Sequence, residues 1–165
     1  MKTSTKKITW QTIRQHPLLF IAFGFGTGLA PIAPGTVATL VAVPIFLLLN
    51  LLPLWFYSLI LVIFTLFAMW LSDWASKKID IHDHPGMNID EIVGFLFAMW
   101  GLPSQPNLII LGFLLFRFFD IVKPWPISWI DKHIRNGAGM ILDDIAAAIP
   151  VCVILHVIFL LFPAV

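Results

Sequence analysis

The stretch DEIVGFLFAMWGLPSQPNLIILGFLLFRFFD, residues 90–120, decides the fold that we predict for this chain. Its two apolar runs, 92–102 and 108–122, flank an uncharged turn, which predicts a helical hairpin. A helix needs about 20 apolar residues to cross a bilayer, and both runs are shorter. Such short runs are expected of a re-entrant hairpin, or of helices whose polar ends are buried in a bundle.

The ends of this hairpin carry acids. Asp90 and Glu91 stand at its entry and Asp120 at its exit, and Asp143 and Asp144 are expected to open the last helix. Because the two ends of an antiparallel hairpin lie at the same depth, we expect five carboxylates, distant in sequence, in one interfacial layer.

Composition places the hairpin in a membrane protein. Of the 165 residues, 59% are hydrophobic and only 12% are charged, whereas a soluble domain has about 25% charged residues. The mean hydropathy is +0.94. We predict an all-α, polytopic membrane protein with about five membrane helices, one domain over residues 1–165. Its other apolar runs are 18–33, 37–52, 54–71 and 145–165.

The first apolar run is unlike the others because it is rich in helix breakers, including Gly24, Gly28 and Pro31. We therefore expect an irregular, re-entrant segment there. All Lys and Arg residues lie in 2–14, 77–78 and 117–135, which then share one side of the membrane. By the positive-inside rule that side is the cytoplasm. A net charge of +1 without a basic run gives no support for nucleic-acid binding.

Several of the acids have simpler explanations. Acids at helix starts cap free N–H groups and suit the helix dipole, which would account for Asp90, Glu91, Asp143 or Asp144. Asp120 instead ends a helix, where a negative charge opposes the dipole, and an ion pair with Arg117 or Lys123 is the remaining structural explanation. Clustered carboxylates repel unless a cation or protons hold them. Oxygen ligands favour a hard ion, Mg²⁺ first.

Phosphate chemistry is indicated by further motifs. An Arg side chain forks onto phosphate oxygens and a Lys supplies a compact charge, as Arg117 and Lys123 could. Pro34, Gly35 and Thr36 precede an expected helix start, where free N–H groups suit a phosphate, although Pro-Gly-Thr is also an ordinary turn. For Asp83 and His84, metal ligation or acid–base work is favoured over a zinc site.

Four blocks together resemble one family, phosphatidylglycerophosphatase A. They are GFGTGLAPIAPGT (24–36), HDHPGMNIDEIVG (82–94), RFFDIVKPWPI (117–127) and GMILDDIA (139–146). The resemblance implies an all-helical fold in the bacterial inner membrane. It also implies Mg²⁺-dependent hydrolysis of phosphatidylglycerophosphate to phosphatidylglycerol and phosphate, in phospholipid biosynthesis. Two departures, Ala38-Thr39 and Met87-Asn88, affect loop packing rather than a carboxylate.

The resulting hypothesis assigns a role to each candidate residue. Mg²⁺ is held by Asp90, Glu91, Asp120 and Asp144, with Asp143 as an additional ligand. Arg117 and Lys123 neutralise the phosphoryl oxygens with help from residues 34–36, and Asp83 or His84 moves the proton.

Two alternative functions stay open. One is another lipid-phosphate phosphatase, and the other is a small cation transporter that uses the interfacial acids. A CDP-alcohol phosphotransferase is disfavoured, because its Asp-Gly-x-x-Ala-Arg signature is missing from the sequence. The expected partners are the phospholipid substrate and the bilayer, without nucleic acid or an obligatory protein partner.

Overall fold

A computed structural model of the protein describes residues 8–81 and 84–162. Within these ranges the chain is all helical, as predicted, and has no strand. Its elements are α1 (Trp10–Gln15), α2 (Pro17–Ala22), the 3₁₀ helix η1 (Gly24–Leu29), α3 (Pro34–Leu49), α4 (Leu54–Ile79), α5 (Ile89–Ala98), α6 (Pro106–Val122), α7 (Ile127–His133) and α8 (Gly137–Leu161).

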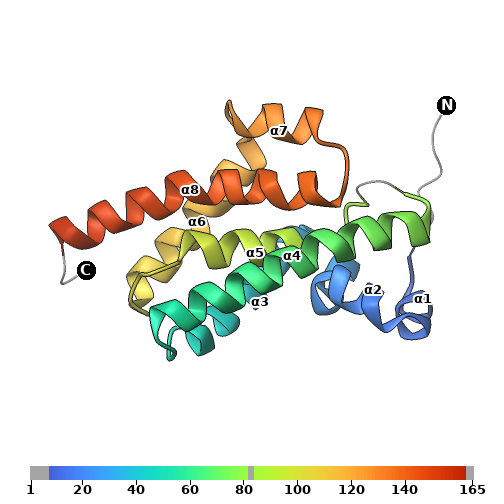
Figure 1. The fold of residues 1–165 in the computed structure, drawn as a ribbon, viewed down its shortest axis with the longest axis horizontal. Coiled ribbons are helices and arrows are strands. Elements are labelled where there is room, and N and C mark those ends of the chain that lie inside the picture. Colours follow the sequence, from blue (N-terminus) through green and yellow to red (C-terminus); the bar gives the residue numbers. More distant parts are fainter. Residues whose placement is uncertain (1–7, 82–83, 163–165) are drawn as a thin grey trace.

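Helix α5 is the centre of the bundle. Seven of its ten residues are buried, and it packs against α3, α4, α6 and α8. Figure 1 shows α4, α5 and α8 running along the long axis of the molecule, with α6 crossing behind α8. The predicted hairpin is thus formed by α5 and α6, and α8 closes over it.

Two helices are long and apolar enough to cross a membrane, namely α4 with 26 residues and α8 with 25. Only 28% of the apolar window of each is buried inside the protein. A core helix of a soluble protein would be mostly buried, whereas here side chains such as Leu66 and Leu160 are 62% and 77% exposed. An outer surface this apolar is typical of a membrane-associated protein.

The other apolar helices are shorter. Helices α3 and α6 have 16 and 17 residues, close to the length of a membrane span. Helix α5 has 10 residues and a length of about 15 Å at 1.5 Å per residue, which is half of a bilayer's hydrocarbon core of about 30 Å. Within residues 8–81 and 84–162, two helices rather than the five that we predicted meet the criterion of length and composition for a membrane span.

The glycine- and proline-rich segment is irregular, as predicted. Helix α2 ends at Ala22, and in η1 the backbone of Phe25 turns left-handed with φ 59°. A second left-handed residue, Ala33 with φ 46°, directly precedes α3. Residues 23–33 therefore interrupt what composition alone would make one continuous apolar helix.

One side chain ties this irregular segment to the start of α5. Asn88 is fully buried, its backbone N–H donates to Ala22 O (3.3 Å), and its Nδ2 donates to Pro34 O (2.9 Å). Thr27 Oγ1 in turn donates to Asn88 Oδ1 (3.2 Å). The unusual Met87-Asn88 pair is thus buried, and its asparagine joins α2, η1 and α3 to the first turn of α5.

We expect Asn88→Ala to lower the free energy of unfolding by about 1–3 kcal/mol, because it leaves buried polar groups without partners. Thermal unfolding of the purified protein in detergent measures the change. The exposed Asn107 is the matched control, and Asn107→Ala should change stability by less than about 0.5 kcal/mol. Equal midpoints for the two variants would contradict this role of Asn88.

Candidate active site

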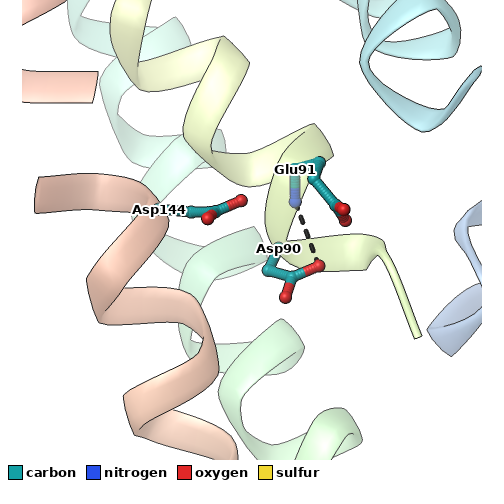
Figure 2. Close-up of side chains that lie close together, drawn as sticks. All are labelled: Asp90, Glu91 and Asp144. Atoms are coloured by element: carbon teal, nitrogen blue, oxygen red, sulfur yellow. Dashed lines mark hydrogen bonds between the residues drawn. The ribbon is translucent and has the colours of Figure 1, made fainter. Parts of the chain in front are cut away.

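Acids from three helices meet at one end of the bundle. Asp90 and Glu91 occupy the first turn of α5, Asp120 the last turn of α6, and Asp144 lies in α8. One carboxylate oxygen from each of Asp90, Glu91 and Asp144 lies within 4.8 Å of the other two. Figure 2 shows the Asp144 side chain extending from α8 toward the first turn of α5. The predicted convergence of distant acids is confirmed.

A cavity of about 160 Å³ opens above these acids. Its walls come from the loop before α5, the end of α6, α7 and the first turns of α8. They are built by Pro85, Met87, Asp90, Glu91, Asp120, Lys123, Asp131, Ile134, Gly139, Met140, Asp143 and Asp144.

Asp143 and Asp144 do not open the last helix, contrary to our prediction. Helix α8 begins at Gly137, and Asn136 Oδ1 caps it by accepting from Gly139 N (2.9 Å). Both acids lie more than a turn inside the helix and are 5% and 3% exposed. Capping therefore cannot account for either of them, and their burial calls for another explanation.

Two glycines allow the close approach of the helices that carry the site. A Cβ at Gly94 on α5 would lie 3.0 Å from Asp144 Cβ and 2.6 Å from Phe116 Cζ. A Cβ at Gly35 on α3 would lie 2.1 Å from Glu91 Oε1. Glycine at these two places lets α8 and the start of α3 press against the acidic turn of α5.

Arg117 faces the acids from α6. Its Nη1 lies 2.6 Å from Asp120 Oδ2 and 3.9 Å from Glu91 Oε1. The ion pair that we considered for Asp120 is therefore present, with Arg117 rather than Lys123. A Cβ at Gly35 would also be 3.1 Å from Arg117 Nη2. The segment Pro34, Gly35 and Thr36 forms the first turn of α3 and lies beside the guanidinium, as a shared phosphate site requires.

Lys123 links three elements. It ends α6 in a left-handed conformation with φ 43°, and its Nζ donates to Asp131 Oδ1 on α7 (2.7 Å) and to Asp143 Oδ2 on α8. Burial lowers the pKa of Lys123, but the hydrogen bonds to the two carboxylates outweigh it and hold the pKa above its ordinary value. The ammonium is charged, and two of its three N–H groups are in use.

The sequence analysis missed α7 and Asp131. The short helix follows a Pro-Trp-Pro sequence and has only seven residues, so residues 124–135 read as a basic loop, although Ile127, Ile130 and Ile134 stand at helical spacing. The available signal was an acid, Asp131, within this basic stretch, eight residues after Lys123.

The predicted acid–base pair is only partly described. Asp83 lies outside the described residues. His84 packs against Phe23, with ring centroids 5.3 Å apart, and its Nδ1 accepts from Gly86 N (3.0 Å). A neutral His84 therefore carries its proton on Nε2. It is absent from the cavity wall, although its neighbour Pro85 belongs to it.

The acidic cluster is electrostatically unfavourable on its own. Burial, followed by the neighbouring carboxylate of Glu91, raises the pKa of Asp90 well above its ordinary value. Burial also raises the pKa of Glu91, and Asp144 and Asp120 add to the effect. Among the described residues, Glu91 Oε2 and Asp144 Oδ2 are buried without a hydrogen-bond partner. Unpaired oxygens that converge in an all-oxygen site fit a hard divalent cation such as Mg²⁺.

The fold and the site together define a class of protein. The chain is an apolar, membrane-associated helical bundle with a buried acidic centre at one end, next to an arginine, a lysine and the start of a helix. Its residues 20–159 match the model of the phosphatidylglycerophosphatase A family. The chain belongs to this family.

Similar proteins of known name support this assignment. The chain is 36% identical over 135 residues to phosphatidylglycerophosphatase A of Escherichia coli strain K12, covering 81% of this chain and 78% of that protein. It is 34% identical over 145 residues to the Haemophilus influenzae protein of the same name, covering 87% and 89%. A provisionally named phosphatidylinositol-3-phosphatase of Bacteroides thetaiotaomicron is 33% identical over 142 residues, covering 79% and 86%. No solved structure is significantly similar to the chain.

We expect Asp144→Asn to stabilise the protein in chelator by about 1 kcal/mol, because it removes one of several like charges buried together. Thermal unfolding in detergent with excess chelator measures the effect. The matched control is Asp80→Asn at the exposed end of α4, which should leave the midpoint nearly unchanged. A clear loss of stability in Asp144→Asn alone would mean that the acids do not repel one another in the folded protein.

Proposed function

We propose that this protein hydrolyses phosphatidylglycerophosphate to phosphatidylglycerol and phosphate, with Mg²⁺ as cofactor, at the cytoplasmic face of a bacterial inner membrane. The observation that carries the proposal is the convergence of Asp90, Glu91 and Asp144 within 4.8 Å, beside Arg117, in a chain of the phosphatidylglycerophosphatase A family. The names of the Escherichia coli and Haemophilus influenzae relatives supply the reaction.

The acids divide by their partners. Asp120 and Asp143 are neutralised by Arg117 and Lys123 respectively. In the part of the chain that the structure describes, no Lys or Arg nitrogen lies closer to the three converging acids than Arg117, 3.9 Å from Glu91. Asp90, Glu91 and Asp144 are therefore the residues that would hold Mg²⁺, with Asp120 and Asp143 at its edge. When bound, Mg²⁺ polarises the phosphoryl group and lowers the pKa of a coordinated water.

The cationic and N–H groups would bind the phosphoryl oxygens. Arg117 is held in place by Asp120 and lies against the first turn of α3. The N–H groups of Gly35 and Thr36 are among the first four of that helix, which have no partner within it. Arg117 and this helix start can thus bind one phosphate together. They lie against Asp120 and Glu91, which line the carboxylate cavity, but do not line it themselves. Lys123 does line the cavity and has a third N–H to offer there.

Proton movement completes the reaction. Water adds its oxygen to phosphorus and gives up a proton, the P–O ester bond breaks, and the leaving alkoxide takes a proton. Asp83 or His84 would move this proton from the attacking water to the alkoxide. His84 lies in the loop that leads through Pro85 to the cavity.

A second lipid-phosphate substrate is favoured by one comparison. The similar Bacteroides thetaiotaomicron protein is named for a phosphatidylinositol phosphate, so the same site can be tested on that headgroup. A cation transporter has less support, because the acids gather at one end of α5 and α6 instead of lining a path along them.

The membrane arrangement follows from the charges. Lys77 and Lys78 end α4, Lys123 ends α6, and Lys132 lies in the last turn of α7. The turns at the opposite ends of the helices, 50–53 and 99–105, are uncharged. We place the carboxylate end at the cytoplasm, with α4 and α8 crossing the bilayer, α3 and α6 nearly crossing it, α5 buried among them, and residues 18–36 re-entering.

Purified protein in detergent micelles should release phosphate from phosphatidylglycerophosphate in Mg²⁺ and should stop when chelator is added. Asp120→Asn should lower kcat/KM by about a hundredfold, because Arg117 loses the carboxylate that orients it. Asp80→Asn is the control and should keep full activity. Activity that persists in chelator, or full activity in Asp120→Asn, would refute the mechanism.

Labelling of single cysteines tests the topology. In a Cys152→Ala background, Ser104→Cys should react with an impermeant maleimide added outside intact cells, because the loop 99–105 faces the periplasm. Lys132→Cys on α7 is the matched control and should react only after the cells are opened. The reverse pattern would invert the proposed arrangement.

A further inference from the structure

An apolar cavity of about 450 Å³ lies next to the carboxylate cavity, between the end of α6, α7 and the middle of α8. We call it the α7–α8 groove. Its volume is within the usual range of small-molecule sites, about 300–1,000 Å³. The side chains that matter below are Phe119, Ile127, Ile130, Ala146, Ile149 and Pro150.

The groove continues the carboxylate cavity along α8. Asp143 belongs to the cavity wall, whereas Ala146 and Pro150, three and seven residues further on, belong to the groove. Positions spaced by three and seven share one face of a helix. At 1.5 Å per residue, the groove extends about 5–10 Å beyond Asp143 toward the C-terminal end of α8. On α6, Phe119 of the groove directly precedes Asp120 of the cavity.

The groove is open to its surroundings. Two of its lining residues, Trp125 and Ile149, are 80% and 59% exposed. Helix α8, which forms one wall, is one of the two helices that are long and apolar enough to cross a membrane. The polar cavity thus has an open apolar groove beside it, along the end of α6 and along the membrane-capable helix α8.

A polar cavity beside an apolar groove matches one kind of ligand, an amphiphile with a phosphate at one end and a hydrocarbon chain at the other. We propose that one acyl chain of the lipid-phosphate substrate lies in the α7–α8 groove while its phosphate lies in the carboxylate cavity. The proposal rests on the proposed function and adds the residues that hold the chain. A protein partner bound to the groove would not account for the position of the groove directly beside the carboxylate cavity.

A second apolar cavity provides the control. It has about 390 Å³ and lies between α4, the end of α5 and α8, where Val62, Phe97 and Val153 line it. Its exposed α8 residue Val153 is nine residues, or about 13 Å, beyond Asp144. It shares Ile149 with the α7–α8 groove, but its other residues on α5 and α8 lie at least six positions from the carboxylate wall. Phe119 and Ala146 of the groove lie one and two positions from that wall, so a chain bound in the control cavity would be farther from the phosphate.

The test compares a long-chain phosphatidylglycerophosphate with its deacylated counterpart, which keeps the headgroup and lacks both chains. Ala146→Phe fills the α7–α8 groove. It should lower the ratio of kcat/KM for the long-chain substrate to that for the deacylated one by about tenfold, mainly through KM. Val153→Phe places the same phenyl ring in the control cavity and should leave the ratio unchanged. Thermal unfolding shows which variants are folded, and Ile130→Trp replaces Ala146→Phe if that variant does not fold.

The outcomes separate the two proposals. A wild-type protein that hydrolyses neither substrate refutes the proposed function, and the acyl-chain site with it. A wild-type protein that is active, with a ratio unchanged in folded Ala146→Phe and Ile130→Trp, overturns the acyl-chain site alone. An equal fall in the ratio for Val153→Phe overturns it as well, because the chain then depends on the wrong cavity.

Discussion

The structure depends on the burial of α5 among four other helices. Seven of its ten residues are buried. The helix therefore cannot rotate to expose Asp90 and Glu91 to water without disrupting the core. The same packing brings Asp144 of α8 and Asp120 of α6 against that turn. The hydrophobic effect thus forces like charges together, at an electrostatic cost that only counter-charges can offset.

The two cations that face the cluster also organise the backbone around it. Arg117 joins the two arms of the hairpin through Asp120 and Glu91, and its guanidinium lies against the start of α3. Lys123 joins α6, α7 and α8 through Asp131 and Asp143. Each cation pairs with one of the cluster's outer acids. Among the described residues, the inner three acids have no Lys or Arg closer than Arg117, which lies 3.9 Å from Glu91. Partial neutralisation of this kind limits the repulsion within the fold and leaves an excess of carboxylates at the centre.

Much of this site could be predicted from the sequence because hairpin geometry is local. Because α5 and α6 are antiparallel, they bring Asp120 beside Asp90. The two apolar runs around an uncharged turn were enough to predict this hairpin. The start of α8 was misplaced because small and polar residues, 136–139, read as loop, although Asn136 caps the helix there. The roles of Asn88 and Asp131 were not predicted, because they depend on tertiary contacts with Pro34 and Lys123. No local sequence pattern indicates such contacts.

The unequal arms of the hairpin agree with a membrane setting. Helix α5 is about 15 Å long and α6 about 25 Å, so residues 99–105 must cover the difference with irregular backbone and only isolated turn hydrogen bonds, such as Leu102 N to Met99 O (3.2 Å). Met99 and Leu102 are buried, and the Asn50 amide, oriented to use both of its groups, donates to Leu102 O and accepts from Ser104 N, each at 3.1 Å. Irregular backbone at membrane depth is tolerated when protein satisfies it. A short α5 is therefore stable inside the bundle. Its first turn holds the acids at one end of the bundle, while α4 and α8 form the apolar outer surface.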